Sequence, residues 1–445
     1  MKTRLANIWE QLQATYWLLP ALLNLLAVLL SLVTISLDRA LMALDAAYLP
    51  WLSVGGPDGA RTMLSTIAGS MITIAGVTFS ITTVALSLAS SQFGPRLLRN
   101  LMRDRGNQLV LGTFIATFMY CLLVLPTVPE GSDARSVPHV SVAVGVLLAV
   151  ASLGVLVYFF HHFAVSIQAD QVIANVGQEL ERAIVRFFPE YPAERAPGRS
   201  IRWTDDLPAN FEEAASRLGA RHSGYVQAID YAGLMRLAVE HDLVVRVNCR
   251  PGDFVARAST SALIWPGEGL DEDLATRIDN AFILGTQRLQ TQDVEYAVNQ
   301  LVEIAVRALS PGVNDPFTAM ACIDQLSTAL VRLAERNLPA PYRYDEANRL
   351  RLVIDVVTMS GIVDAAFNQI RQYGRSSVGV TIRLLETIAV IAAHTHHREL
   401  RDALREQATM IKQGSEEELT EVRDRRDVLA RFEMIKDVLE IDATD

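Results

Sequence analysis

The chain has 445 residues, half of them hydrophobic, and a formal net charge of −10 at pH 7. This length exceeds that of one ordinary domain, and the acidic balance argues against a general nucleic-acid-binding protein. Cys121, Cys249 and Cys322 lack the paired spacing of a disulfide framework or a zinc site. We therefore expect no bound metal, no cofactor and no nucleic-acid partner.

Four apolar stretches, each long enough to cross a bilayer, lie in the first part of the chain. They are residues 18–37, 62–93, 108–128 and 137–160, and we expect each to be a transmembrane helix of a domain covering residues 1–163. None of them carries Asp, Glu, Lys or Arg in its interior. Proton-coupled transporters usually need such a residue at depth, so this absence argues against that class.

Basic residues in the short loops set the expected orientation. The N-terminus and the loop after the second span carry six of them, against three on the opposite side. The six are Lys2, Arg4, Arg96, Arg99, Arg103 and Arg105; the three are Arg39, Arg61 and Arg135. Because cytoplasmic loops are enriched in Lys and Arg, we expect both termini in the cytoplasm.

Small and hydroxylic residues recur along the second span in steps of four and three. On a helix this spacing places them on one seam. The seam consists of Gly69, Thr73, Gly76, Ser80, Thr83, Ser87 and Ser90. Two interpretations remain open, namely close packing against another helix and a hydrated path lined by hydroxyl groups. The two interpretations are compatible in a homo-oligomer in which each copy contributes this helix to a central axis.

The second span is followed by a short basic segment, residues 95–106, that begins with a proline suited to a first helical turn. Arg96, Arg99 and Arg103 share one face of the expected helix. They would contact anionic headgroups, form a basic ring at a pore mouth, or only set the orientation of the spans.

Charged residues dominate the chain after the fourth span. We expect a helix extension and linker over residues 164–223, with residues 165–188 continuing the fourth span. A small β-rich module is expected over residues 224–265, because residues 225–230 and 243–248 alternate in polarity.

The remainder of the chain, residues 266–445, has mainly helical spacing. Residues 271–285, 293–309 and 378–393 are among the expected helices. The predicted fold class is therefore a membrane α-helical protein with four transmembrane helices, joined to a cytoplasmic, mainly helical α+β domain with a small β module.

A polar loop joins two of the expected helices. Its candidate residues are Ser310, Pro311, Gly312, Asn314 and Asp315. We expect Gly312 to end the first helix with a positive φ angle and Asp315 to cap the next helix. Capping explains every residue type in this loop except Asn314, and the alternative is a loop that binds a ligand or a neighbouring subunit.

The sequence contains no recognisable catalytic set. There is no Walker loop, nucleophile elbow or metalloprotease pair. His394 and His397 share a helix face, but no carboxylate or cysteine at a suitable spacing completes a metal site. We therefore do not expect an enzyme.

Two stretches resemble a known family. They are residues 76–99 (GVTFSITTVALSLASSQFGPRLLR) and residues 308–319 (ALSPGVNDPFTA). Both are similar to the bacterial predicted membrane proteins grouped as domain of unknown function 2254, and the likeness covers nearly the whole chain. The resemblance implies a bacterial inner-membrane protein with this division of parts, and it implies no activity.

The leading hypothesis is a homo-oligomeric ion channel or gated pore with the second transmembrane helix near its axis. The alternative is a non-conducting scaffold or sensor whose cytoplasmic domain binds a protein or a small ligand. The expected partners are the lipid bilayer, further copies of the same chain and anionic lipid.

Overall fold

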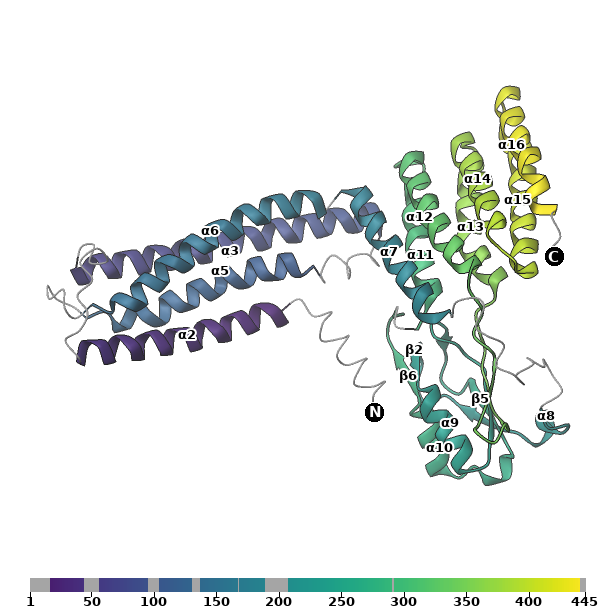
Figure 1. The fold of residues 1–445 in the computed structure, drawn as a ribbon, viewed down its shortest axis with the longest axis horizontal. Helices are drawn as coiled ribbons and strands as arrows, with labels where there is room; N and C mark the ends of the chain where they lie inside the picture. Colours follow the sequence, from purple (N-terminus) through teal and green to yellow (C-terminus); the bar gives the residue numbers. More distant parts are fainter. Residues whose placement is uncertain are drawn as a thin grey trace. The chain divides into compact units, whose positions relative to one another are not determined.

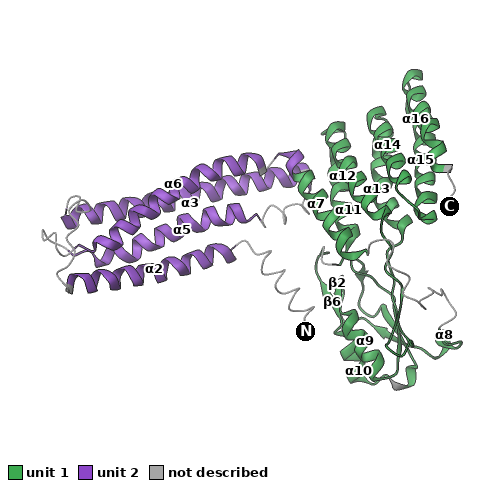
Figure 2. Ribbon diagram, viewed as in Figure 1, with its two compact units in different colours: residues 1–7, 172–445 green, residues 8–171 purple. Residues whose placement is uncertain are grey.

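The computed structural model describes residues 17–43, 56–94, 104–129, 137–166, 168–188, 207–289 and 292–440. The chain forms two compact units, one over residues 8–171 and one over residues 172–445 (Figure 2). Each unit is described by itself below.

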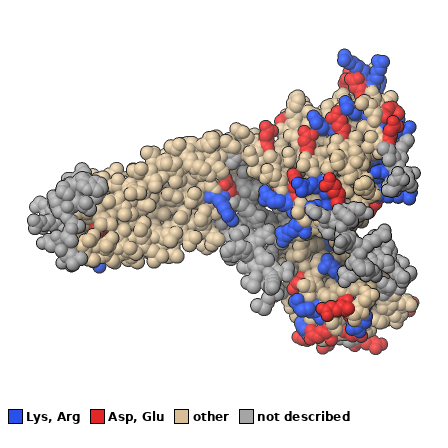
Figure 3. All heavy atoms as spheres, in the orientation of Figure 1, with Lys and Arg blue, Asp and Glu red and all other residues tan. Residues whose placement is uncertain are grey.

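Four helices of the first unit are long and apolar enough to cross a membrane. They are α2 (Leu18–Ala43), α3 (Gly56–Phe93), α5 (Arg105–Val124) and α6 (His139–Ser166), and the 3₁₀ turn η2 (Leu125–Thr127) follows α5 (Figure 1). The visible face of this unit is almost bare of charged side chains (Figure 3). Each predicted span is recovered, but α2 continues past Leu37 and α3 begins before Thr62.

Helix α5 is the central helix of the first unit, since it packs against α2, α3 and α6. Its Phe114, Tyr120 and Val124 are fully buried. Gly112 allows α2 to approach closely, because a Cβ atom there would lie 2.7 Å from Leu23 Cδ1 and 3.0 Å from Pro20 Cα.

Helix α7 (Ala169–Phe187) is separate from α6, which ends at Ser166. The prediction of one continuous helix through this region was therefore wrong. The buried face of α7 includes Val176 and Leu180. It packs near α12, where Glu181 pairs with Arg332 at 3.3 Å.

Two sheets form the β part of the second unit. A five-stranded sheet has the order β1-β5-β3-β8-β7, in which only the β3–β8 pair is parallel, and a three-stranded antiparallel sheet has the order β4-β2-β6. The strands are β1 (Ser216–Gly219), β2 (Gly224–Ile229), β3 (Val244–Val247), β4 (Phe254–Val255), β5 (Thr260–Trp265), β6 (Phe282–Gly285), β7 (Tyr342–Tyr344) and β8 (Leu350–Val353).

Apolar side chains from both sheets and from two short helices share one core. The helices are α9 (Tyr231–Glu240) and α10 (Glu272–Asp279), while α8 (Phe211–Ala214) and the 3₁₀ turn η4 (Gly267–Gly269) lie in connections. Residues 282–285 form β6, which corrects the prediction of a helix through residue 285. Because β1, β6, β7 and β8 lie outside residues 224–265, the β part is not one contiguous segment of the sequence.

Three helical hairpins stand side by side in the rest of the second unit (Figure 1). They are formed by α11 (Val294–Ala308) with α12 (Pro316–Ala334), α13 (Met359–Gly374) with α14 (Val378–Ala393), and α15 (Arg398–Glu418) with α16 (Val422–Glu440). Helices α11, α13 and α15 contact one another in sequence, as do α12, α14 and α16, so the stack has two layers. No fixed repeat appears in the sequence, because β7 and β8 are inserted between the first two hairpins only.

A buried arginine attaches that insertion to the sheet. Arg351 is 2% exposed, and it pairs with Asp345 at 2.9 Å and with Asp242 at 2.7 Å. Arg351 Nη1 also donates to Leu243 O. These bonds fix β8 beside the turn that leads into β3.

Candidate functional site

Helix α3 has two chemically different faces. One face packs inside its own unit, and its buried residues are small or apolar with two threonines. They include Ala60, Leu64, Ala68, Met71, Ala75, Thr78, Thr82 and Ala89. This face contacts α5 and α6, so the apolar packing requirement of α3 is met by helices of the same chain.

The predicted seam lies on the other face of α3. Gly69, Thr73, Gly76, Ser80, Thr83 and Ser87 are exposed, and Ser90 is half-buried. At 100° per residue the seam lies roughly 140° around the helix from the buried face. A Cβ atom built on Gly69 or Gly76 would meet no atom within 4 Å. No helix among the described residues of this chain therefore covers the seam.

Two hydroxyl groups on the seam donate their hydrogens within the helix. Thr73 Oγ1 donates to Gly69 O at 2.8 Å, and Thr83 Oγ1 donates to Phe79 O at 2.9 Å. A hydroxyl oxygen that has donated its hydrogen still has lone pairs that accept. The seam thus presents acceptor oxygens and open space, which suit water, a cation or a closely packed backbone.

A buried carboxylate lies near one end of the first unit. Asp38 of α2 is 4% exposed. Its two oxygens accept hydrogen bonds from Val140 N and Ser141 N, both at 2.9 Å, and from Ser141 Oγ. Because a helix N-terminus has unpaired N–H groups and partial positive charge, this carboxylate from α2 caps α6.

Further polar groups join the helices inside the same unit. Tyr120 Oη donates to Ser141 O at 3.0 Å and lies 3.0 Å from Thr34 Oγ1. Thr117 Oγ1 and Ser152 Oγ are also 3.0 Å apart. These contacts link α2, α5 and α6, and none of these residues lies on the α3 seam.

A histidine–carboxylate pair lies at the start of α5. Asp104 caps this helix by accepting from Gly106 N at 2.8 Å, and its other oxygen lies 2.7 Å from His162 Nε2 on α6. The Tyr158 ring stacks on His162 with centroids 5.2 Å apart. The pair holds the beginning of α5 against the end of α6. The neighbouring candidates Arg96, Arg99 and Arg103 lie outside the described residues.

The loop between α11 and α12 combines tight geometry with exposed apolar side chains. Asp315 caps α12, and hydrogen bonds from the Thr318 side chain and backbone hold the pKa of the Asp315 carboxyl below its ordinary value. Asn314 adopts the positive φ angle, at 50°, whereas Gly312 does not. The prediction for Gly312 was therefore wrong, and the conformation of Asn314 explains its presence.

The same loop exposes two large apolar side chains. Val313 is 57% exposed and Phe317 is 77% exposed. Ser310 and Asp315 are half-buried, while Pro311, Gly312 and Asn314 are exposed. The loop is thus held by hydrogen bonds among its own residues, and it presents an apolar surface outward.

Sequence reasoning did not identify Asp38 or the Asp104–His162 pair as structural contacts. Asp38 was left outside the first predicted span, residues 18–37, whereas the structure places it within α2. One signal was available: residues 137–140 (VPHV) provide no capping side chain at the start of α6. A helix that begins inside an apolar unit without its own cap needs an acceptor from elsewhere in the chain.

The chain is similar to known sequences over most of its length. Residues 13–390 match the family described as predicted membrane protein, domain of unknown function 2254. Uncharacterized proteins of Mycobacterium bovis and Mycobacterium tuberculosis are each 32% identical over 392 residues, which covers 87% of this chain and 74% of theirs. No solved structure matches.

Proposed function

Since this chain belongs to the predicted membrane protein family of domain of unknown function 2254, we propose that it works as a homo-oligomer in the membrane, with the α3 helices of neighbouring copies facing one another. The relatives named above are bacterial, and we place the protein in the bacterial inner membrane with both termini in the cytoplasm. We further propose that it is not an enzyme.

The outward direction of the α3 seam is the observation that supports this proposal. Lipid chains gain nothing from a row of glycines and hydroxyls, whereas small residues allow two helix backbones to approach closely and gain van der Waals contact. The packing face of α3 is already occupied within the chain, so the seam is available to a second copy. In a homo-oligomer, one face of α3 packs inside its own chain and the seam packs against a second copy.

Conduction is the activity that this arrangement supports best. Several α3 helices around an axis would present the oxygens of Thr73, Ser80, Thr83 and Ser87 to the centre. Hydroxyl oxygens replace part of the water shell of an ion, and hydrophobic constrictions gate by dewetting. We therefore propose an ion channel or gated pore, with a non-conducting scaffold or sensor as the alternative.

Cysteine cross-linking tests the oligomer. The three native cysteines, which are buried, are first replaced by alanine, so that only the introduced cysteine can form a disulfide. Ser80→Cys should form disulfide-linked dimers in membranes. Leu153→Cys on α6, where the native side chain is 61% exposed, is the matched control and should remain monomeric. Equal cross-linking at both positions, or none at Ser80→Cys, would contradict α3-to-α3 contact.

Planar bilayer recording separates the two candidate functions. The purified protein should conduct, and Ser80→Leu should reduce the conductance by narrowing and drying the axis. Ile81→Leu, at an exposed position of α3 roughly 100° around the helix from Ser80, should leave it unchanged. If the Ser80→Cys variant cross-links but the purified protein does not conduct in the bilayer, the scaffold or sensor is favoured.

A further inference from the structure

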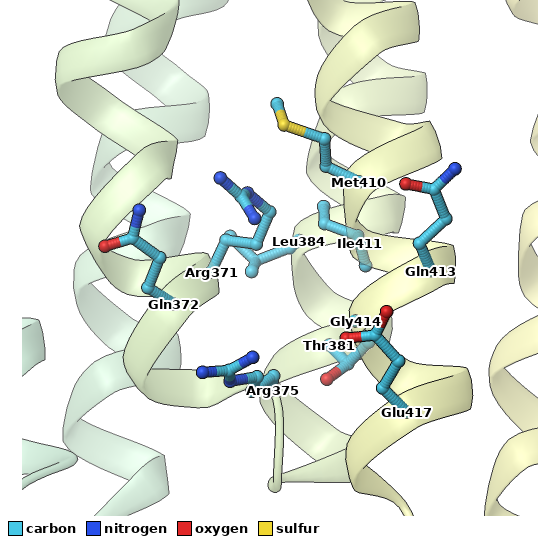
Figure 4. Close-up of a pocket in the computed structure, with 10 residues that line it drawn as sticks. All are labelled: Arg371, Gln372, Arg375, Thr381, Leu384, Met410, Ile411, Gln413, Gly414 and Glu417. Carbon is cyan, nitrogen blue, oxygen red and sulfur yellow. The ribbon is translucent and has the colours of Figure 1, made fainter.

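A cavity of about 190 Å³ lies between the second and third helical hairpins. Its walls come from α13, α14 and α15, and Figure 4 shows the side chains that line it. Arg371 and Arg375 project from the end of α13, while Gln413 and Glu417 approach from α15. The cavity is therefore polar, and two guanidinium groups from one helix end face it.

The Arg371 guanidinium is held in place by neutral groups. Its Nε donates to Gln407 Oε1 and its Nη2 donates to Asn368 Oδ1, both at 3.3 Å. Gln407 is 1% exposed, and its Nε2 donates in turn to Asp364 Oδ1 and Asn368 Oδ1. Only two of the five N–H groups of Arg371 are used in these bonds. The buried amide thus orients a guanidinium that keeps free donors.

The positive charge of the cavity is not neutralised by ion pairs. Over residues 207–289 and 292–440, neither Arg371 nor Arg375 forms an ion pair, although Arg383 and Arg405 nearby pair with Asp324 and Asp402. Burial and, next, the charge of Arg375 lower the pKa of Arg371, while the charge of Asp364 opposes this shift. Two adjacent guanidinium groups therefore face the cavity, and the one carboxylate among its lining residues, that of Glu417, forms no ion pair with either of them.

Gly414 keeps one wall of the cavity open. It lies inside α15, where glycine costs about 1 kcal/mol relative to alanine in a helix. A Cβ atom at this position would meet only Arg375 Cβ, at 3.9 Å, which is ordinary contact. Close packing therefore does not require the glycine, and its effect is to leave space beside the arginines.

From these observations we infer that the cavity between α13, α14 and α15 binds a small oxyanion of the phosphate class through Arg371 and Arg375. Guanidinium groups match the geometry of phosphate oxygens and form charge-assisted hydrogen bonds with them. Gln413 supplies an amide donor at the rim. Glu417 is the opposing charge, and it limits the affinity of the site for anions.

Titration calorimetry with inorganic phosphate tests this site in the full-length protein in detergent at constant ionic strength. The wild-type protein should bind phosphate, and Arg375→Gln should bind about tenfold more weakly, the value expected for one charge-assisted hydrogen bond. Glu417→Gln should bind more tightly. Arg398→Gln is the matched control on α15, since that side chain is 92% exposed, and it should bind like the wild type.

Absence of phosphate binding by the wild type, or equal affinity in the wild type, Arg375→Gln and Glu417→Gln, would overturn the inference. Repeating the titration in nanodiscs identifies the source of the phosphate group. Equal affinity in phosphatidylcholine and phosphatidylglycerol discs indicates a soluble anion, whereas weaker affinity in phosphatidylglycerol discs indicates a competing lipid headgroup. The site does not depend on the proposed α3 assembly, because a monomer carries all of its residues.

Discussion

Helices α3 and α5 are both apolar enough to cross a membrane, yet their surroundings differ. α5 packs against α2, α3 and α6, and its buried hydroxyls bond to other helices, as Thr117 does with Ser152. α3 contacts the unit through one face only, and the seam hydroxyls of Thr73 and Thr83 bond within their own helix. Buried hydroxyls such as that of Thr117 thus join helices, whereas the seam of α3 faces away from the helices of its own unit.

Asp38→Ala should lower the free energy of unfolding more than the other substitutions described below. It removes the acceptor of Val140 N, Ser141 N and Ser141 Oγ, and leaving buried donors unsatisfied costs about 3 kcal/mol in total. Unfolding in detergent, followed by circular dichroism, measures the loss. Asp58→Ala, an exposed first-turn position of α3, is the control and should change the free energy of unfolding little.

Two glycines distinguish the enclosed helix from the exposed one. Gly112→Ala on α5 forces its Cβ against Leu23 and Pro20, so we expect a destabilisation of about 2 kcal/mol from overpacking. Gly69→Ala on α3 meets nothing and should not lower the stability of the monomer. Thermal unfolding of both variants in the same detergent makes the comparison. A similar loss at the two sites would contradict the difference between the helices.

Thr117→Val should have a smaller effect. The substitution keeps the shape of the side chain and removes its hydroxyl, which lies 3.0 Å from Ser152 Oγ. Interhelical hydrogen bonds in membranes average about 0.6 kcal/mol, and we expect a loss of that size. Ser152 retains its bond to Leu148 O, so no buried donor is left without an acceptor. A double-mutant cycle with Ser152→Ala measures the coupling directly.

Gly76→Leu should leave the unfolding of the monomer nearly unchanged and weaken self-association. Its new side chain extends from the seam into space that no described residue of the chain occupies. Sedimentation in density-matched detergent measures the association. Ile81→Leu, exposed off the seam, is the control. A monomeric wild-type protein, or an association unaffected by Gly76→Leu, would count against the seam as a contact surface.

Helices with clear periodicity and clear ends were predictable from the sequence. The predicted bounds of α14, residues 378–393, agree with the structure, because this helix has regular apolar spacing. The existence of the four long apolar helices was predictable from length and hydropathy, although the end of α2 and the start of α3 were not. The seam was also visible in the sequence, but spacing alone does not say whether it points into or out of the unit.

The missed features depend on contacts between distant residues. β6 is a four-residue apolar run, too short to distinguish from the end of a helix, and it becomes a strand by pairing with β2. The break between α6 and α7 has no proline or glycine to announce it. Asn314 took the positive φ angle expected of Gly312, because both residue types tolerate it.

The parallel pairing of β3 with β8 has a consequence for synthesis of the protein. Val245 pairs with Leu352, so the sheet cannot be completed until the first helical hairpin has left the ribosome. Until then the edge of β3 has unpaired backbone groups, which are a template for misassociation. Folding of the second unit is thus tied to chain elongation across more than one hundred residues, and a slow β-pairing step is built into its topology.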